Sequence, residues 1–169
     1  NKLVDVPVVI MAGGRGMRLD PLTKILPKPL LPLNDKPLIE HIINKFYEYG
    51  INLFYLTLNY KNKLIKAYFE ELSPDYQLEF IEEDIPLGTL GGLGLLKNKF
   101  NKSFFLTNCD IIIKDDYYEI YEFHEKNKND LTIVVSAKKY HIPYGVCEIN
   151  EDGTLKTINE KPGYNILAN

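Results

Sequence analysis

The sequence has few of the residues that bind transition metals or form disulfides. Its 169 residues include two cysteines and three histidines. Cys109 and Cys147 lie far apart and form no C-x-x-C pair, so two reduced, partly buried thiols are favoured over a zinc site or a redox disulfide. The histidines are equally scattered, and none has a second metal ligand four residues further on. We therefore expect no metal site built on cysteine or histidine.

An excess of positive charge and long hydrophobic runs are also missing. The formal net charge is -3 and the isoelectric point is near 5.7, which argues against nucleic acid or an anionic membrane as the main partner. A small anionic ligand is left open. No apolar stretch reaches the length of a membrane span, and the first ten residues lack the order of a signal peptide. We predict a cytoplasmic protein.

Segments typical of buried strands alternate with helical patterns. Apolar runs predict strands at 6–11, 53–58, 78–81, 104–109 and 131–137, with more exposed strands at 145–149 and 155–159. Helical patterns lie at 37–49, 61–72, 90–97 and 117–126. This order predicts an α/β fold with a Rossmann-like, mostly parallel sheet flanked by helices, and ligands beyond the carboxyl ends of its strands. The turn at 150–155 predicts a late antiparallel hairpin.

A glycine-rich turn follows the first predicted strand. Gly13, Gly14 and Gly16 allow backbone amides to point together at an anion, which is one way in which proteins hold phosphate. Leu19 stands where the dinucleotide-binding fingerprint needs its third glycine, and the G-x-x-x-x-G-K-[ST] pattern of a P-loop is missing as well. Taken alone, the pattern also fits an ordinary tight turn.

A proline-rich stretch takes the place of the helix that usually follows such a turn. Lys28 lies between Pro27 and Pro29, so we expect an extended, stiff backbone that limits where its ammonium group moves. Arg18 can donate two hydrogen bonds to phosphate oxygens, whereas Arg15 can point to water. The alternative is that these cations are solvated loop residues. We expect three leucines to attach the loop to the core: Leu30, Leu31 and Leu33.

Asp110 follows the apolar run 104–109, at the carboxyl end of a predicted central strand. A carboxylate is rarely placed there for stability alone, and Mg²⁺ prefers one or two carboxylates together with substrate phosphates. The alternative is a helix cap or a solvated acid. By contrast, Asp116 stands three residues before Glu119, which predicts a capping box for the helix at 117–126.

The stretch AGGRGMRLDPLTKILPKPLLPLNDKPLIEHII resembles the signature of the sugar-phosphate nucleotidyltransferases, roughly G-G-x-G-x-R-L-x-P-L-T followed by P-K-P-L-x-P. Further blocks follow in order over nearly the whole chain: EEDIPLGTLGGL at 82–93, LTNCD at 106–110, YGV at 144–146 and EKP at 160–162. The resemblance implies a glycosyltransferase-A-like nucleotidyltransferase fold. It implies transfer of a nucleotidyl group from a nucleoside triphosphate to a sugar 1-phosphate with Mg²⁺ as cofactor. The PKPLLP form of the lysine block favours GTP.

The same resemblance implies roles for individual residues. It assigns catalysis to Arg18, Lys28 and Asp110, with Asp110 as the metal ligand. It places the nucleotide against Gly13, Gly14, Gly16, Glu83, Gly88 and Thr89. It places the sugar phosphate against Gly145, Glu160 and Lys161. The structural alternatives are an exposed strand-end acid for Glu83, a strand-entry glycine for Gly145, and a solvated turn for Glu160 and Lys161.

The resemblance also implies a longer protein. In the family a second aspartate holds the metal at a position beyond Asn169, so we expect a nucleotidyltransferase domain over 1–169 that is truncated at both ends. Catalysis by this part alone is in question, whereas triphosphate binding through its first half is expected to survive. A homo-oligomer and a fused regulatory domain are left open.

Two other functions are weighed against this one. A regulatory relative would sense nucleotide sugars without making them, but it would not need Arg18, Lys28 and Asp110 together. A cytidylyltransferase would share the glycine turn, but the EKP block and the PKP lysine disfavour it.

Overall fold

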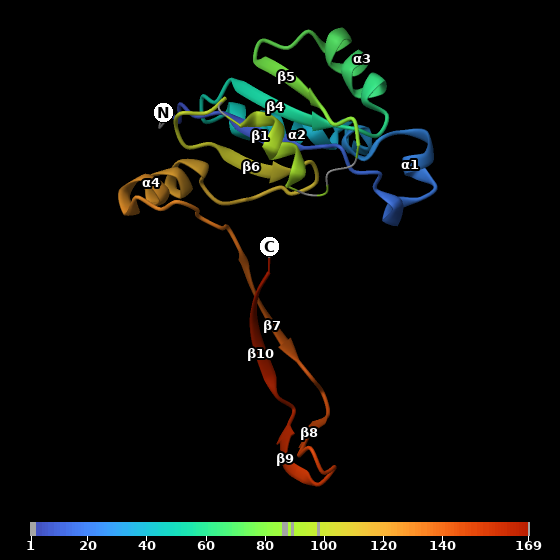
Figure 1. The fold of residues 1–169 in the computed structure, drawn as a ribbon, viewed down its shortest axis with the longest axis vertical. Coiled ribbons are helices and arrows are strands. Elements are labelled where there is room, and N and C mark those ends of the chain that lie inside the picture. The colour runs from blue at the N-terminus through green and yellow to red at the C-terminus, as the bar shows by residue number, and fades with distance from the viewer. Residues whose placement is uncertain (1–2, 86–87, 89, 98, 169) are drawn as a thin grey trace. The chain divides into compact units, whose positions relative to one another are not determined.

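The computed structural model describes residues 3–85, 88, 90–97 and 99–168. It separates into two compact units, Asn1–Tyr121 and Glu122–Asn169, and each unit is described by itself. Figure 1 shows the order of the helices and strands along the chain. Among the described helices, none combines the length and the apolar character needed to span a bilayer.

The first unit contains a parallel sheet of four strands (Figure 1). The strands are β1 (Val8–Met11), β4 (Leu53–Leu58), β5 (Gln77–Glu82) and β6 (Phe105–Asn108), and they lie in the order β5-β4-β1-β6. Met11 at the end of β1 pairs with Thr57 of β4 and with Asn108 of β6. The segments that follow these three strands therefore meet at one edge of the sheet, where parallel α/β folds bind ligands.

The longer helices pack against one face of this sheet, and a short 3-10 helix packs against the other. The longer ones are α2 (Leu38–Tyr47), α3 (Asn62–Leu72) and α4 (Tyr117–Asn127), the last of which continues into the second unit. Short elements complete the unit: η1 (Met17–Leu19), α1 (Leu22–Ile25), η2 (Lys28–Leu30), β2 (Pro32–Leu33), β3 (Lys36–Pro37) and η3 (Gly91–Leu96). Asp116 caps α4 as predicted, because its carboxylate accepts the N–H groups of Tyr118 and Glu119 at 2.8 and 3.3 Å.

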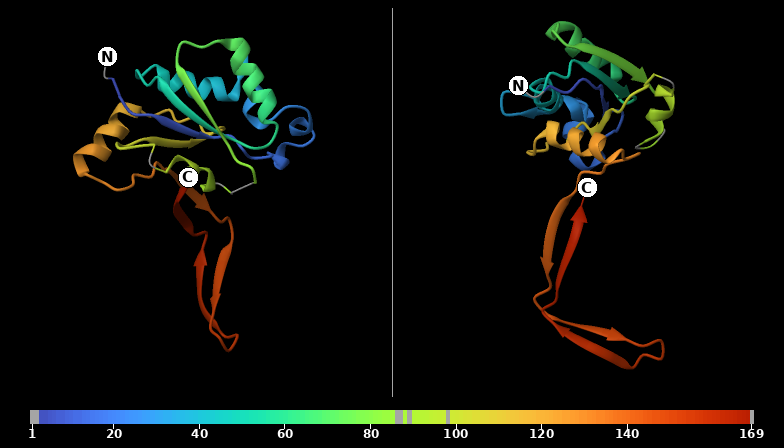
Figure 2. Two further views of the ribbon diagram at one scale, coloured as in Figure 1. Left: turned by 45° about the horizontal axis from the view of Figure 1, so that its top comes forward. Right: turned by 90° about the vertical axis from the view of Figure 1, so that its left-hand side faces the viewer.

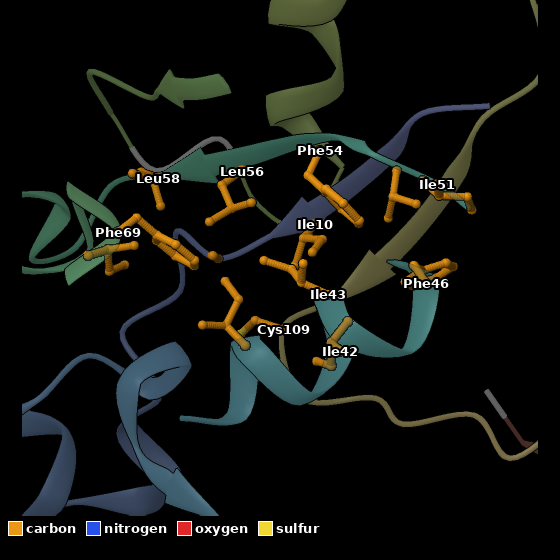
Figure 3. Close-up of a cluster of buried hydrophobic side chains, with 14 of the residues drawn as sticks. Ile10, Ile42, Ile43, Phe46, Ile51, Phe54, Leu56, Leu58, Phe69 and Cys109 are labelled. Carbon is orange, nitrogen blue, oxygen red and sulfur yellow. The ribbon is translucent and has the colours of Figure 1, made fainter. Parts of the chain in front are cut away.

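The core lies mainly between the sheet and α2 and α3. Figure 3 shows Ile10 of β1 and three alternate side chains of β4 facing Ile42, Ile43 and Phe46 of α2. The three β4 residues are Phe54, Leu56 and Leu58. Successive residues of a strand point to opposite faces, so Val9 instead belongs to a second cluster with Tyr55 and Leu96 of η3. Buried on both faces, β1 is a continuous apolar run, as expected for a central parallel strand.

Beyond the end of α4, the strands of the second unit form two antiparallel ribbons (Figure 2). Strand β7 (Ser136–His141) pairs with β10 (Gly163–Ala168), and β8 (Gly145–Ile149) pairs with β9 (Leu155–Glu160). The turn between β8 and β9 closes with a hydrogen bond of 2.8 Å from the Asn150 N–H group to the Thr154 carbonyl oxygen, and Gly153 there has a φ of 83°. The predicted late hairpin is confirmed, and so is the α/β fold with its parallel sheet.

Three local predictions were wrong. Residues 131–135 form neither strand nor helix, and β7 begins only at Ser136, because an apolar run becomes a strand only where another strand pairs with it. The segment predicted as a helix at 90–97 is the 3-10 helix η3, whose glycines at 91, 92 and 94 weaken an α-helix. Cys109 is buried, but Cys147 is exposed rather than partly buried, because its strand belongs to an exposed ribbon.

Candidate active site

The glycine turn follows β1 and is held against the end of β4. The Ala12 N–H group donates to the Thr57 carbonyl oxygen at 3.0 Å. Gly16 has a φ of 66°, in the left-handed region that favours glycine. A Cβ atom at this position would lie 3.0 Å from Cγ2 of Thr23 and 3.2 Å from Cβ of Lys28. Position 16 therefore needs glycine both for its backbone and for the close approach of Lys28.

The proline-rich loop is stiff, but its conformation differs from the prediction. Lys28 starts the 3-10 turn η2 instead of being extended, and the N–H groups of Leu30 and Leu31 donate to the carbonyl oxygens of Pro27 and Lys28 at 2.9 and 3.1 Å. A proline is compatible with the first turn of a helix because its missing N–H has no partner there. Leu30 and Leu31 are buried as expected, whereas Leu33 lies on the short strand β2 and is 38% exposed.

Lys28 and Asp110 form an ion pair beside the glycine turn. The Lys28 ammonium donates to Oδ2 of Asp110, and the two side chains keep 25% and 37% of their surface exposed. Asp110 is placed by β6, since the N–H group of Cys109 continues the pairing with β1 by donating to the Met11 carbonyl oxygen at 3.2 Å. The sheet edge therefore brings together an ammonium group, a carboxylate and the glycine turn.

The two arginines lie on either side of Gly16, and both are exposed. Arg18 belongs to η1, directly after the turn. The guanidinium carbon of Arg15 lies 6.0 Å from the centroid of the Tyr60 ring, so this side chain lies over an aromatic face instead of pointing only to water. Gly14 is open, since a Cβ atom there would meet no atom within 4 Å.

The donor set at Asp110 fits a metal ion that is shared with a ligand. In the described parts of the chain, no three His, Cys, Asp or Glu side chains cluster closely enough to hold a metal ion. Mg²⁺ commonly keeps several waters and binds one or two carboxylates together with substrate phosphates, and a half-exposed Asp110 suits that mode. The neighbouring thiol does not contribute, because burial, followed by the charge of Asp110, raises the pKa of Cys109 to about 12. That thiol is protonated at neutral pH.

Glu83 lies between the glycine turn and η3. Its N–H group donates to the Leu58 carbonyl oxygen at 2.8 Å, and its own carbonyl oxygen accepts the Asn59 side-chain amide at 2.7 Å. Its carboxylate oxygen Oε1 would stand 3.5 Å from a Cβ atom at Gly13 and only 2.6 Å from one at Gly92. The carboxylate thus occupies the space that a side chain at position 92 would need. Gly88 has a φ of 79° and an open surface, while Thr89 lies outside the described residues.

The residues that follow β4 were not identified from the sequence. Tyr60 donates from its hydroxyl to the Thr23 carbonyl oxygen at 3.1 Å. Lys61 donates to the carbonyl oxygens of Lys24 and Ile25 at 2.7 and 2.8 Å. The only signal for them in the sequence is their place at the carboxyl end of a predicted parallel strand, where ligand-binding segments gather.

Three predicted site residues lie together in the second unit. Gly145 of β8 pairs with Glu160 of β9, and a Cβ atom at Gly145 would stand 3.1 Å from the Glu160 carboxylate. The Lys161 N–H group donates to the Tyr144 carbonyl oxygen at 3.2 Å, and its ammonium lies 4.0 Å from the Glu160 carboxylate. A small shift of the exposed Glu160 side chain would make room for a Cβ atom at position 145, and the role of these residues toward a sugar stays a prediction.

The sequence matches a known protein family and is similar to named proteins. The family model described as nucleotidyl transferase matches residues 7–166. The catalytic subunit beta of mannose-1-phosphate guanylyltransferase from Drosophila pseudoobscura pseudoobscura is 34% identical over 161 residues, which are 91% of this chain and 43% of that protein. Mannose-1-phosphate guanyltransferase from Yarrowia lipolytica is 35% identical over 153 residues, 88% of this chain and 42% of that protein. The chain thus spans less than half the length of these relatives.

Solved structures share the fold. HddC from Yersinia pseudotuberculosis superposes with a TM-score of 0.66 at 26% identity, covering 97% of this chain and 73% of HddC. A UDP-glucose pyrophosphorylase in complex with UDP-glucose gives a TM-score of 0.63 at 19% identity, covering 94% of this chain and 70% of that one. At such identity the second likeness concerns the fold alone.

Proposed function

From the membership of this chain in the nucleotidyl transferase family, we propose that the protein transfers a nucleotidyl group from a nucleoside triphosphate to a sugar 1-phosphate. The observation that carries the proposal is the Lys28–Asp110 pair beside the glycine turn, at the carboxyl edge of the parallel sheet. The names of the curated relatives support GTP and mannose 1-phosphate as the substrates. The products would be GDP-mannose and pyrophosphate.

The reaction requires orientation and charge neutralisation rather than a general base. A phosphate oxygen of the sugar 1-phosphate attacks the α-phosphorus, and the bond from that phosphorus to the bridging oxygen of the β-phosphate breaks. Pyrophosphate leaves with the electron pair of that bond. The nucleophile is already an anion, so no proton has to be removed from it. The protein must therefore hold two anions in line and stabilise the charge that develops on the leaving group.

The residues of the sheet edge suit this task. The amides around Gly13, Gly14 and Gly16 would bind the triphosphate, and Lys28 and Arg18 would neutralise its oxygens. Asp110 would hold Mg²⁺, which supplies further positive charge to the phosphates when it is bound. Glu83, Gly88 and Thr89 would face the nucleoside, and a carboxylate such as that of Glu83 can accept hydrogen bonds from the N–H groups of a guanine edge. Gly145, Glu160 and Lys161 stay the predicted residues for the sugar phosphate.

The test is pyrophosphate release by the full-length protein with Mg²⁺. Each of the common nucleoside triphosphates is combined with hexose and hexosamine 1-phosphates, and we expect release with GTP and mannose 1-phosphate. Release with another pair would correct the substrates and keep the reaction. If no pair reacts although a separate measurement shows that the protein binds a nucleoside triphosphate, the transferase function is wrong and a regulatory relative is favoured.

A further inference from the structure

The segment after β4 is joined to the loop that carries Lys28. Lys61 donates to two carbonyl oxygens in the last turn of α1, those of Lys24 and Ile25, and Tyr60 donates to that of Thr23. We propose that Lys61 is a positioning residue, which fixes α1 and thereby holds Lys28 over the glycine turn to receive a triphosphate. This inference rests on the proposed function.

Helix α1 needs such an anchor. It contains four residues, and so short a helix is unstable by itself. Its last carbonyl groups have no partners within the helix and carry a partial negative charge, which an ammonium group complements. Lys28 stands three residues after Ile25, so a displacement of this helix end would carry Lys28 with it.

Lys61 is well suited to hold that position. Its backbone has a φ of 53°, a conformation that non-glycine residues adopt only where the surroundings impose it. It directly precedes α3, which is fixed to the core by the buried side chains of Ile65 and Phe69. The ammonium is therefore held by a residue next to the core-anchored helix α3, while its acceptors lie in the short helix α1.

The same contacts extend to the glycine turn. The Thr23 side chain is buried, and its hydroxyl donates to the Gly16 carbonyl oxygen at 3.2 Å or to the Asp20 carboxylate at 2.7 Å. Thr23 and Lys28 are also the two residues that a Cβ atom at Gly16 would meet. Fixing α1 thus fixes both the glycine turn and the lysine beside it.

The hydrogen bonds of Lys61 do not involve the ammonium group of Lys28. That ammonium is bound to Asp110, and a triphosphate would compete for it. The hydrogen bonds of Lys61 end on backbone oxygens instead, so they persist when Lys28 exchanges its carboxylate partner for phosphate. A loop that is already in place when the triphosphate binds loses less conformational entropy on binding, so the affinity is higher.

The first experiment measures hydrogen exchange of backbone amides in the full-length protein without nucleotide. In Lys61→Met, we expect the amides of Leu26, Leu30 and Leu31 to exchange about tenfold faster than in the unchanged protein, because local opening becomes easier. Lys61→Arg, which keeps the charge and the donors, should stay within about twofold. The matched control is Lys63→Met, at an exposed lysine in the first turn of α3. Equal exchange in Lys61→Met and Lys63→Met would overturn the inference.

The second experiment measures binding of a non-hydrolysable GTP analogue with Mg²⁺. We expect Lys61→Met to weaken binding about tenfold in the unchanged background and less than about twofold when Lys28 is already alanine, since residues that act through one contact are not additive. Additive losses would overturn the inference. If the unchanged protein binds no nucleoside triphosphate, the proposed function fails, and the exchange data still decide whether Lys61 holds the loop.

Discussion

Lys28 and Asp110 are 82 residues apart in the chain and bind each other at the carboxyl edge of the sheet. Each is the preferred partner of one half of a magnesium–triphosphate complex: the ammonium suits phosphate oxygens, and the carboxylate suits the metal ion. In the proposed function, the two halves would compete with the ion pair when they bind singly and would replace it completely when they bind together.

This competition predicts opposite effects of one substitution on two ligands. Lys28→Met should raise the affinity for Mn²⁺ alone by about twofold to fivefold, because Asp110 loses a half-exposed ion-pair partner. The same change should weaken triphosphate binding. Electron paramagnetic resonance of free Mn²⁺ measures the first effect and calorimetry the second. Asp110→Asn should lower the Mn²⁺ affinity, and if neither change affects Mn²⁺, Asp110 is not a metal ligand.

If the proposed function holds, turnover should depend on the two cations that follow the glycine turn. We expect Lys28→Ala and Arg18→Ala each to reduce the rate of pyrophosphate release by the full-length protein at least about a hundredfold, since each removes a preorganised charge that stabilises the leaving group. Lys63→Ala, at the exposed position on α3, serves as the control for a lost surface charge. Rates near normal in both cation variants would contradict the assignment of the site.

The glycines of η3 provide a matched pair of substitutions. Gly92→Ala should weaken GTP binding about tenfold or more, because its methyl group would stand 2.6 Å from the Glu83 carboxylate and displace it. Gly94→Ala in the same helix should have little effect, since a Cβ atom there meets nothing within 4 Å. Calorimetric titration of both variants compares them. Similar affinities would show that Glu83 does not contact the nucleotide.

The two thiols should differ in reactivity and in their effect on stability. At pH 8 we expect iodoacetamide to modify Cys147 and not Cys109, which mass spectrometry of the native protein detects. Folding raises the pKa of Cys109 from 9.0 to about 12, so its contribution to the free energy of unfolding is complete below pH 9. That contribution is lost as the pH rises from 9 to 12, because the unfolded thiol ionises first. Early modification of Cys109 would contradict its burial.

Much of the fold could be predicted because it depends on local patterns. Strand β4 and the start of helix α4 follow from apolar periodicity and from the cap at Asp116. Residues 131–135 have the same apolar character but form no strand, because a strand also depends on a neighbour that a local pattern does not specify. The 3-10 helix η3 differs from the prediction because three of its six residues are glycines, which weaken an α-helix although the leucines between them favour one.

The site could be predicted only where it follows a motif. The glycine turn, Lys28 and Asp110 stand in recognisable blocks, and the structure brings them together. The single domain over 1–169, its truncation and the sugar-binding group stay predictions. Lys61 and Tyr60 were missed because they donate to backbone carbonyl oxygens. Every residue has such a carbonyl group, so the sequence does not show which ones are bound.

The parallel pairing of β1 with β6 has a consequence for how the gene tolerates insertions and deletions. Met11 stands opposite Asn108, and Asp110 comes two residues later. Removing one residue from within β6 would shift the rest of the strand and Asp110 by about 3.3 Å and turn each shifted side chain to the opposite face of the sheet. The ion pair between Asp110 and Lys28 would then be lost, although the composition of the chain is almost unchanged. A length change in the connection before Phe105 would leave that spacing intact, so we expect natural variation in length to be concentrated there.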